Sequence, residues 1–433
     1  MISPEQAQYF FTNTEDAVCV ISSSGALQYA NPSAEKLFGL PADSKMKIWN
    51  AVPYVEGNDD LIQLFIDAVS NKVASHEAIV DYVNNDGVVS NIHVRMTCYG
   101  EDTSEYLVVI TNLTQLFKVN SALVRYTSPD IADYALATAE GQKSGGQTRN
   151  VTIVMSDLRG FTALGSKLAA EELITVLNHY FAAMVAVIQK YGGTVIEFLG
   201  DGIFTVFGAP KDLEDHATRA VKCAVEMQSA LHEVNAWNRE NGYPELEMGI
   251  GVNSGNAVVG NIGSEKKMKY GCMGSVVNIT GRLESLTIGG QVFSTENTRK
   301  VITEDLTIAS ESSFLPKGAP EELKYYEITG IAGLSTGDGS ERNIVWQDSC
   351  EEKEYVFYVL EEKKVGVEAL NGKIAKRSTN DRFAFFTTDA ELAEKQNIML
   401  RKGDECIYAK VIRKEPDGFI ICFTSMSQNV NHA

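Results

Sequence analysis

Apolar positions change their spacing several times along the chain, and these changes mark the expected elements. Residues 1–113 mix short strands with short helices. Gly25 sits in a hairpin turn, Pro32 starts a helix, and Gly39 ends it. The expected strands are 17–23, 26–31, 76–84, 88–99 and 105–113, and the expected helices are 32–38 and 61–69. We therefore predict a small mixed domain of helices and strands.

This order of elements is similar to that of PAS sensor domains. The similarity rests on the initial hairpin, the helix N-P-S-A-E-K-L-F-G (31–39), three closing strands and the ending VVITNLT. It implies a PAS fold for residues 1–113 and assigns no particular PAS ligand. No reactive-cysteine motif of the flavin-binding type is present. His76 and His93 are either haem ligands or surface residues of strands.

Residues 114–150 are expected to link this domain to the next one. Leu113, Leu116, Asn120 and Leu123 follow a 3, 4, 3 spacing with one polar position, which is typical of a short coiled-coil seam. We favour a parallel dimer helix over a helix that packs on its own domain. Residues 140–150 are polar and glycine-containing, which predicts a loop.

Strands and helices alternate from residue 151 to 333. Their order predicts a β-α-β-β-α-β core of the ferredoxin-like class, with additional elements. The expected helices are 169–190, 212–235 and 275–286, and a strand hairpin is expected around Gly200 and Asp201.

Residues 341–433 are rich in strand-like runs, and the turn EPDGF separates the last two. We expect a small β-barrel or sandwich of unknown role. It faintly resembles a PilZ barrel, but the residues that bind a cyclic dinucleotide are not matched. The predicted fold class of the whole chain is α+β.

Composition narrows the possible partners and location. The chain has 38 basic and 57 acidic residues, a net charge of −19, which disfavours nucleic acid and anionic membrane surfaces as partners. The seven cysteines form no C-x-x-C pair and suggest reduced thiols in the cytoplasm. No secretory signal is recognisable. The most apolar helical stretch, 181–188, is shorter than the ~20 residues of a membrane span.

Two carboxylates carry the strongest chemical signal. Asp157 closes an apolar strand, and Asp201 lies on the turn of the hairpin FLGDG. A lone aspartate at a turn is usually a turn former. Two of them at strand ends of a ferredoxin-like core suggest a site for two Mg²⁺ or Mn²⁺ ions, which prefer oxygen ligands and support phosphoryl transfer.

The same segment resembles the class III nucleotidyl cyclases over about 180 residues. The matching blocks keep the family's order: VTIVMSDLRGFTAL, ELITVLNHYFAAMVAVIQKYGGTVIEFLGDGIFTVFGAP, DHATRAVKCAVEMQ, MGIGVNSGNAVVGNIGS, YGCMGSVVNITGRLES and LPKGAPEELKYYEI. A diguanylate cyclase would need a Gly-Gly-Asp/Glu-Glu-Phe run on the hairpin, which FLGDGIF does not supply. A non-catalytic regulator would be expected to lack some of the family's catalytic residues.

The resemblance implies a role for each matching position. Asp157, Asp201 and the carbonyl of Leu158 would bind the metals, and Asn278 would orient the ribose. Two further positions complete the set. Arg282 would stabilise charge on the α-phosphate, and Lys317 would contact the terminal phosphates, although Lys317 could also be an ordinary surface lysine. Because Asn278 and Arg282 are four residues apart, one helix face presents both.

Base recognition would involve Glu197 and Gly271. Adenylate cyclases typically have lysine at the position of Glu197, and a carboxylate there accepts hydrogen bonds from the N1–H and the exocyclic amine of guanine. Gly271 departs from the usual Asp, Thr or Cys, and Cys272 is an alternative if the alignment shifts by one residue. We expect a sensor-regulated guanylate cyclase, a phosphorus–oxygen lyase that makes cyclic GMP from GTP at a homodimer interface. The alternative is an adenylate cyclase.

Overall fold

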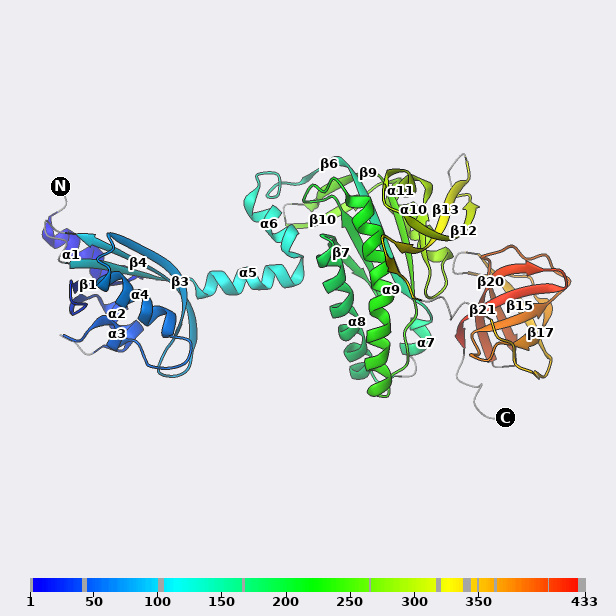
Figure 1. Cartoon of the computed structure of the whole chain (residues 1–433), viewed down its shortest axis with the longest axis horizontal. Helices are drawn as coiled ribbons and strands as arrows, with labels where there is room; N and C mark the ends of the chain where they lie inside the picture. The colour runs from blue at the N-terminus through cyan, green and yellow to red at the C-terminus, as the bar shows by residue number, and fades with distance from the viewer. Residues whose placement is uncertain are drawn as a thin grey trace. The chain divides into compact units, whose positions relative to one another are not determined.

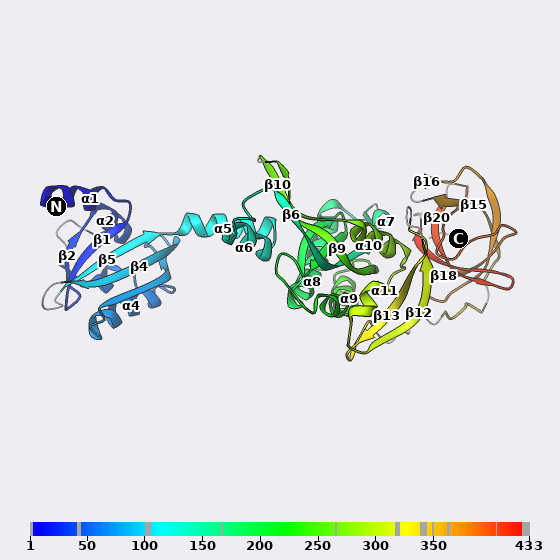
Figure 2. The ribbon, with the colours of Figure 1, turned by 90° about the horizontal axis from the view of Figure 1, so that it is seen from above.

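The computed structural model describes the chain in ten stretches and divides it into two compact units, Met1–Tyr126 and Thr127–Ala433. The described stretches are 3–40, 45–99, 105–165, 168–264, 266–316, 321–337, 344–348, 350–361, 364–403 and 405–426. Figure 1 and Figure 2 show the elements of both units.

The first unit is built on a five-stranded antiparallel sheet with the order β2-β1-β5-β4-β3. Its strands are β1 (Ala17–Ser22), β2 (Leu27–Ala30), β3 (Ser75–Val83), β4 (Val89–Tyr99) and β5 (Glu105–Asn112). Its helices are α1 (Pro4–Asn13), α2 (Pro32–Phe38), α3 (Ile48–Ala51), α4 (Asp59–Ser70) and α5 (Thr114–Tyr126). The predicted hairpins and α2 are confirmed, whereas α1 and α3 were not expected.

Local chemistry fixes the ends of α2. The Asn31 side chain accepts a hydrogen bond from the Ala34 amide at 2.9 Å and caps the helix. Gly39 ends it in the left-handed conformation at φ 65°, which glycine adopts without a Cβ penalty. On the sheet, His93 contacts Glu77 at 2.9 Å, as expected of a surface residue in a strand.

Helix α5 confirms the helical prediction for the linker. None of its residues is buried, and Leu116 of the apolar seam is 62% exposed, whereas Leu123 is partly buried. The second unit begins with α6 (Pro129–Ala137).

The loop predicted for 140–150 is wrong from Gly145 onward. Strand β6 runs from Gly145 to Leu158, and its first residues pair with β9 from Gly145↔Asn261 to Asn150↔Asn256. Main-chain pairing, which needs no apolar side chains, makes a strand of this polar sequence. The strand that leads to Asp157 therefore starts before residue 151.

The ferredoxin-like core lies within a larger sheet with the order β12-β13-β11-β9-β6-β8-β7. Its strands are β7 (Thr194–Leu199), β8 (Gly202–Phe207), β9 (Met248–Ser264), β10 (Lys267–Met273), β11 (Val292–Thr295), β12 (Leu306–Phe314), β13 (Leu323–Ile331) and β14 (Leu334–Ser335). The helices are α7 (Phe161–Gly165), α8 (Ala170–Lys190), α9 (His216–Glu240), α10 (Ser275–Leu286) and α11 (Glu296–Val301). Helices α8 and α9 lie side by side in both views (Figure 1, Figure 2).

Helix α8 is longer than the apolar stretch expected from the sequence. By length and composition it could cross a membrane, and no other helix among the described residues passes that test. Val176, Tyr180, Met184 and Ile188 form its buried face and belong to the core of the second unit. Only 28% of the apolar window of α8 is buried, so one face of the helix packs on the core and the rest is exposed within this chain.

The C-terminal strands form a closed barrel. Their order is β16-β15-β17-β18-β21-β20-β19, and β15 also pairs with β19. The strands are β15 (Lys353–Glu361), β16 (Lys364–Val365), β17 (Leu370–Arg377), β18 (Phe383–Thr387), β19 (Asn397–Lys402), β20 (Glu405–Glu415) and β21 (Gly418–Met426). The barrel alternative of our prediction is confirmed. All seven cysteines lie in the described part of the chain, and none is in a disulfide.

Candidate active site

The two predicted metal carboxylates converge at one end of the central strands. Asp157 and Leu158 end β6, and Asp201 occupies the turn between β7 and β8. The pairing Ser156↔Ile203 brings these ends together. A Cβ on Gly202 would lie 2.7 Å from the Ser156 carbonyl oxygen and 3.3 Å from Asp157 Oδ1. Only glycine therefore permits so close an approach of the turn to β6.

The electrostatics of this pair suit a cation. Burial and the nearby charge of Asp157 raise the pKa of Asp201 from 3.8 to about 6, although hydrogen bonds from the amides of Asp201 and Leu158 oppose the shift. Behind the pair, Tyr180 is wholly buried, and burial raises the pKa of its hydroxyl. Two carboxylates that repel each other would bind a divalent cation with relief of that repulsion.

The side chains alone do not complete a metal coordination sphere. No cluster of three or more His, Cys, Asp or Glu side chains suited to a metal occurs among the described residues. The remaining ligands would have to be main-chain oxygens such as that of Leu158, water, or the phosphates of a substrate. The residues present therefore fit metals that arrive with a phosphorylated substrate.

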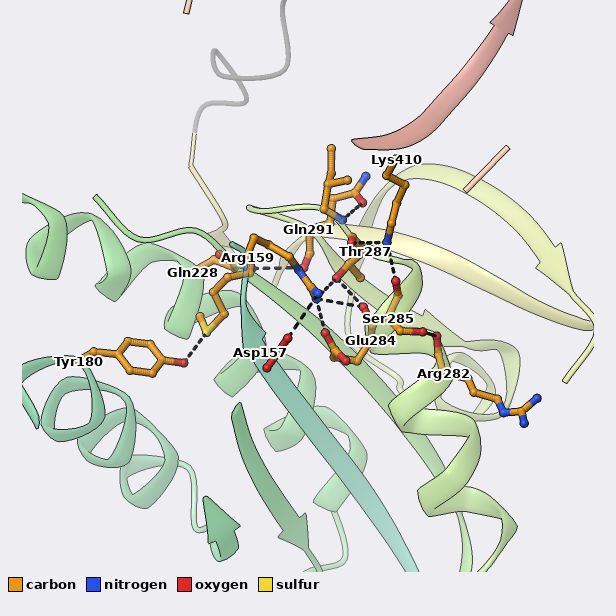
Figure 3. Close-up of polar contacts among 12 residues, drawn as sticks. Asp157, Arg159, Tyr180, Gln228, Arg282, Glu284, Ser285, Thr287, Gln291 and Lys410 are labelled. Carbon is orange, nitrogen blue, oxygen red and sulfur yellow. Dashed lines mark hydrogen bonds and ion pairs between the residues drawn. The ribbon is translucent and has the colours of Figure 1, made fainter. Parts of the chain in front are cut away.

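Arg159 connects the metal carboxylates to α10 and was not expected from the sequence. Its guanidinium lies 3.6 Å from Asp157, forms an ion pair with Glu284 and donates to the Thr287 hydroxyl at 2.9 Å (Figure 3). Burial raises the pKa of Glu284, and the charge of Arg159 opposes that rise. The run Asp157-Leu158-Arg159 does indicate a cation beside the metal carboxylates. The sequence does not indicate Glu284, the partner of Arg159, because it lies 125 residues further along the chain.

Helix α10 carries two of the three other predicted catalytic residues, Asn278 and Arg282. Asn278 is exposed and Arg282 is half-buried. In Figure 3 the guanidinium of Arg282 points away from Asp157. The structure thus brings Asp157, Leu158 and Asp201 together, but it does not direct Arg282 of the same chain to them.

The predicted base-recognition residues lie on β7 and β10. Glu197 forms an ion pair with Lys269, a partner that the sequence analysis did not identify. Gly271 is buried, and a Cβ there would lie 3.0 Å from Ile262 Cδ1. Cys272 packs in an apolar cluster with Tyr270 and Val276, and burial raises the pKa of its thiol to about 11. Lys317 lies outside the described residues, so its role stays a prediction.

Comparison with known protein families identifies two domains of the chain. Residues 144–330 match the model of the adenylate and guanylate cyclase catalytic domain, and residues 5–70 match a PAS domain. The central segment is a class III nucleotidyl cyclase domain. The PAS prediction is confirmed as well, and so is the α+β fold class with its C-terminal β domain.

Relatives of the cyclase domain include enzymes named for both nucleotides. Adenylate cyclase 1 of Rhizobium meliloti is 29% identical over 42% of this chain, and receptor-type guanylate cyclase gcy-28 of Caenorhabditis elegans is 29% identical over 57%. The chain covers only 28% and 20% of their respective lengths. The crystal structure of the guanylyl cyclase Cya2 is 46% identical, with 45% of this chain and all of that one covered, at a TM-score of 0.44.

Class III cyclases generally use divalent metal ions. In the cyclase domain of this chain, the convergence of Asp157 and Asp201 is consistent with that requirement. The domain match covers the segment that holds every predicted site residue from Asp157 to Lys317.

Proposed function

We propose that the chain is a sensor-regulated guanylate cyclase that converts GTP to cyclic GMP and pyrophosphate. The observation that carries the guanine preference is Glu197, a carboxylate on the strand that leads to Asp201. Guanine offers two adjacent donors, N1–H and the exocyclic amine, to a carboxylate. Adenine presents a lone pair at N1, which a carboxylate repels.

Lys269 supports this assignment. Its ammonium group forms an ion pair with Glu197 and so holds the carboxylate in position on β7. Lys269 and Gly271 are two apart on β10 and so point to the same side of the strand. The lysine can therefore supply the donor for guanine O6 that the glycine lacks.

The residues of the chain divide the catalytic work. Asp157, Asp201 and the Leu158 carbonyl would hold two Mg²⁺ or Mn²⁺ ions. When bound, such ions activate the attacking ribose 3′-hydroxyl and neutralise charge on the phosphates. Asn278 orients the ribose, and Arg282 stabilises the charge that develops on the α-phosphate. Lys317 contacts the terminal phosphates.

We further propose a composite site in a two-fold homodimer. One chain supplies Asp157 and Asp201, and the other supplies Asn278, Arg282 and the base-recognition residues. The outward direction of Arg282 in the single chain supports this arrangement. The exposed apolar seam of α5 would pair with that of a second chain in parallel, so that the PAS domain regulates how two cyclase domains meet. We place the enzyme in the cytoplasm.

Product identification tests the proposal. Purified protein is incubated with GTP or ATP in the presence of Mn²⁺, and the products are separated and identified. We expect cyclic GMP and pyrophosphate, with a kcat/KM for GTP at least about tenfold above that for ATP, the lower range of an unmade charged hydrogen bond. A preference for ATP would establish the adenylate alternative.

A further inference from the structure

The C-terminal barrel contacts the cyclase domain where α10 ends. Lys410 of β20 is only 3% exposed, and its ammonium group donates to the carbonyl oxygens of Ser285 at 2.5 Å and Thr287 at 3.0 Å (Figure 3). The last carbonyls of a helix have no partner within the helix, and a cation is favourable there. Lys410 thus acts as a C-terminal cap supplied from another part of the chain.

This lysine is held in an unfavourable environment. Burial, together with the charge of Arg159, lowers the pKa of Lys410 to about 7, and the charge of Glu284 opposes that shift. Burial of an ammonium group is costly unless its N–H groups are hydrogen-bonded. The carbonyl oxygens of Ser285 and Thr287 provide these hydrogen bonds to Lys410.

Two more contacts fix the loop that follows α10. Arg382 donates to the Gly289 carbonyl at 2.7 Å and lies 3.1 Å from Glu247. Ile288 is 8% exposed and packs in an apolar cluster with barrel residues that include Phe383 and Ile420. The loop is therefore held by one cation at each end and by an apolar side chain between them.

The barrel also reaches the strand end that carries the metal carboxylates. A Cβ on Gly160, at φ 69°, would lie 2.6 Å from the carbonyl oxygen of Thr424 in β21. Gly160 directly follows Arg159, the residue that pairs with Glu284. The barrel thus touches both cyclase segments that the Arg159–Glu284 ion pair joins.

We propose that the C-terminal barrel is a positioning element for catalysis, and that Lys410 is the residue through which it sets α10. Arg282 lies one helical turn before the carbonyls that Lys410 binds, so a shift of the helix end moves its guanidinium directly. Misplacement by about 1 Å can cost about a hundredfold in rate. This inference rests on the proposed cyclase function and gives a role to a domain for which the sequence predicted none.

A first test separates positioning from binding. In the full-length enzyme, Lys410→Met should lower kcat about ten- to a hundredfold and leave KM for the nucleotide within about twofold, since its effect is on transition-state geometry. Mn²⁺ binding, measured directly by electron paramagnetic resonance, should be unchanged. The control is Lys414→Met, an exposed lysine of the same strand, which should keep wild-type kcat.

A second test uses the composite site. In a heterodimer of Asp157→Ala and Arg282→Ala chains, the intact site takes its α10 from the Asp157→Ala chain. Lys410→Met should abolish most of the recovered activity when placed on that chain and almost none when placed on the Arg282→Ala chain. Lys414→Met should be silent on either chain.

The outcomes are distinguishable. Equal losses from either chain would show a general folding effect, and no loss from either would show that Lys410 positions nothing, so both results would overturn the proposal. Unchanged or raised kcat in Lys410→Met would do the same. If Asp157→Ala and Arg282→Ala recover no activity together, the composite site fails, and the first test alone then decides the role of Lys410.

Discussion

Arg159 and Glu284 form an ion pair that joins the strand end of the metal carboxylates to helix α10. Arg159 is two residues from Asp157, and Glu284 is two residues from Arg282. In the proposed homodimer, Asp157 and Arg282 of one chain belong to opposite active sites. The ion pair therefore links the two sites through a single chain, and it offers a direct route by which occupancy of one could affect the other.

Glu197→Lys should remove most GTP turnover. The substitution places an ammonium group against the donors of guanine and beside Lys269, so both the hydrogen bonds and the ion pair are lost. An unmade charged hydrogen bond costs about 1–3 kcal/mol, which corresponds to a 5- to 150-fold loss in kcat/KM. Good ATP activity need not appear, because Gly271 remains.

Glu214→Lys provides the control for charge reversal. Glu214 is an exposed residue of the turn before α9, and the substitution should leave GTP turnover unchanged. A Glu197→Lys enzyme with a GTP kcat/KM within a few-fold of wild type would show that the base assignment is wrong.

Asp201→Asn should stabilise the metal-free protein. The folded pKa of Asp201, about 6, is raised above its ordinary value of 3.8, so its ionised form destabilises the fold above pH 6. That cost declines as the pH falls through 6 and vanishes below 3.8. With EDTA at pH 8, the variant should gain about 1–2 kcal/mol in unfolding free energy, less than the full shift implies because the group is partly exposed.

Thermal unfolding with and without metal checks this expectation. At pH 5 the difference between wild type and Asp201→Asn should shrink. Saturating Mn²⁺ should raise the Tm of the wild type and change the variant little, since a cation stabilises only the state that binds it. An Asp201→Asn protein less stable than wild type in EDTA at pH 8 would contradict the proposed charge repulsion.

Asp157→Ala and Arg282→Ala should complement each other. Each homodimer should be nearly inactive, because one lacks a metal ligand and the other lacks transition-state stabilisation. With random pairing about half of the dimers are heterodimers, each with one intact site, so the mixture should recover about a quarter of wild-type activity. If chains shown to exchange recover no more than either parent, the site must lie within one chain.

Insertion of one residue next to Asn120 should change activity several-fold. Helix α5 gains 1.5 Å and everything beyond the insertion rotates by about 100°. A seam that sets the placement of two cyclase domains would lose its register. The measurement compares basal turnover and dimer mass with wild type, and unchanged turnover would mean that α5 is only a tether.

The sequence predicted the helices, strands and turns that carry the site better than the side-chain contacts between them. Asp157, Asp201 and helix 275–286 could be located because apolar periodicity and turn residues act locally. The partners Lys269, Glu284 and Lys410 could not be found, since each contact joins residues more than 70 positions apart. Polar contacts between such distant residues produce no periodic pattern in the sequence.

Predictions of the fold failed where main-chain pairing outweighed side-chain pattern. Residues 145–150 are polar and contain Gly145 and Gly146, yet they extend β6 because β9 offers a partner strand along its whole length. The closure of the barrel by β15 and β19, which pair with each other as well as with β17 and β20, is likewise a main-chain pairing between distant segments. Helix α10, by contrast, has the bounds that its periodicity predicted.

Ile288 has a consequence for how such enzymes can be assembled from parts. Its side chain is covered by Phe383, Ile420 and their neighbours on the barrel. A cyclase domain cut free near residue 340 would display this side chain to water, and the separated barrel would display the matching apolar surface. Gene fusions that transplant the catalytic segment into a new host protein should therefore carry the barrel with it, so that these two parts are inherited as one cassette.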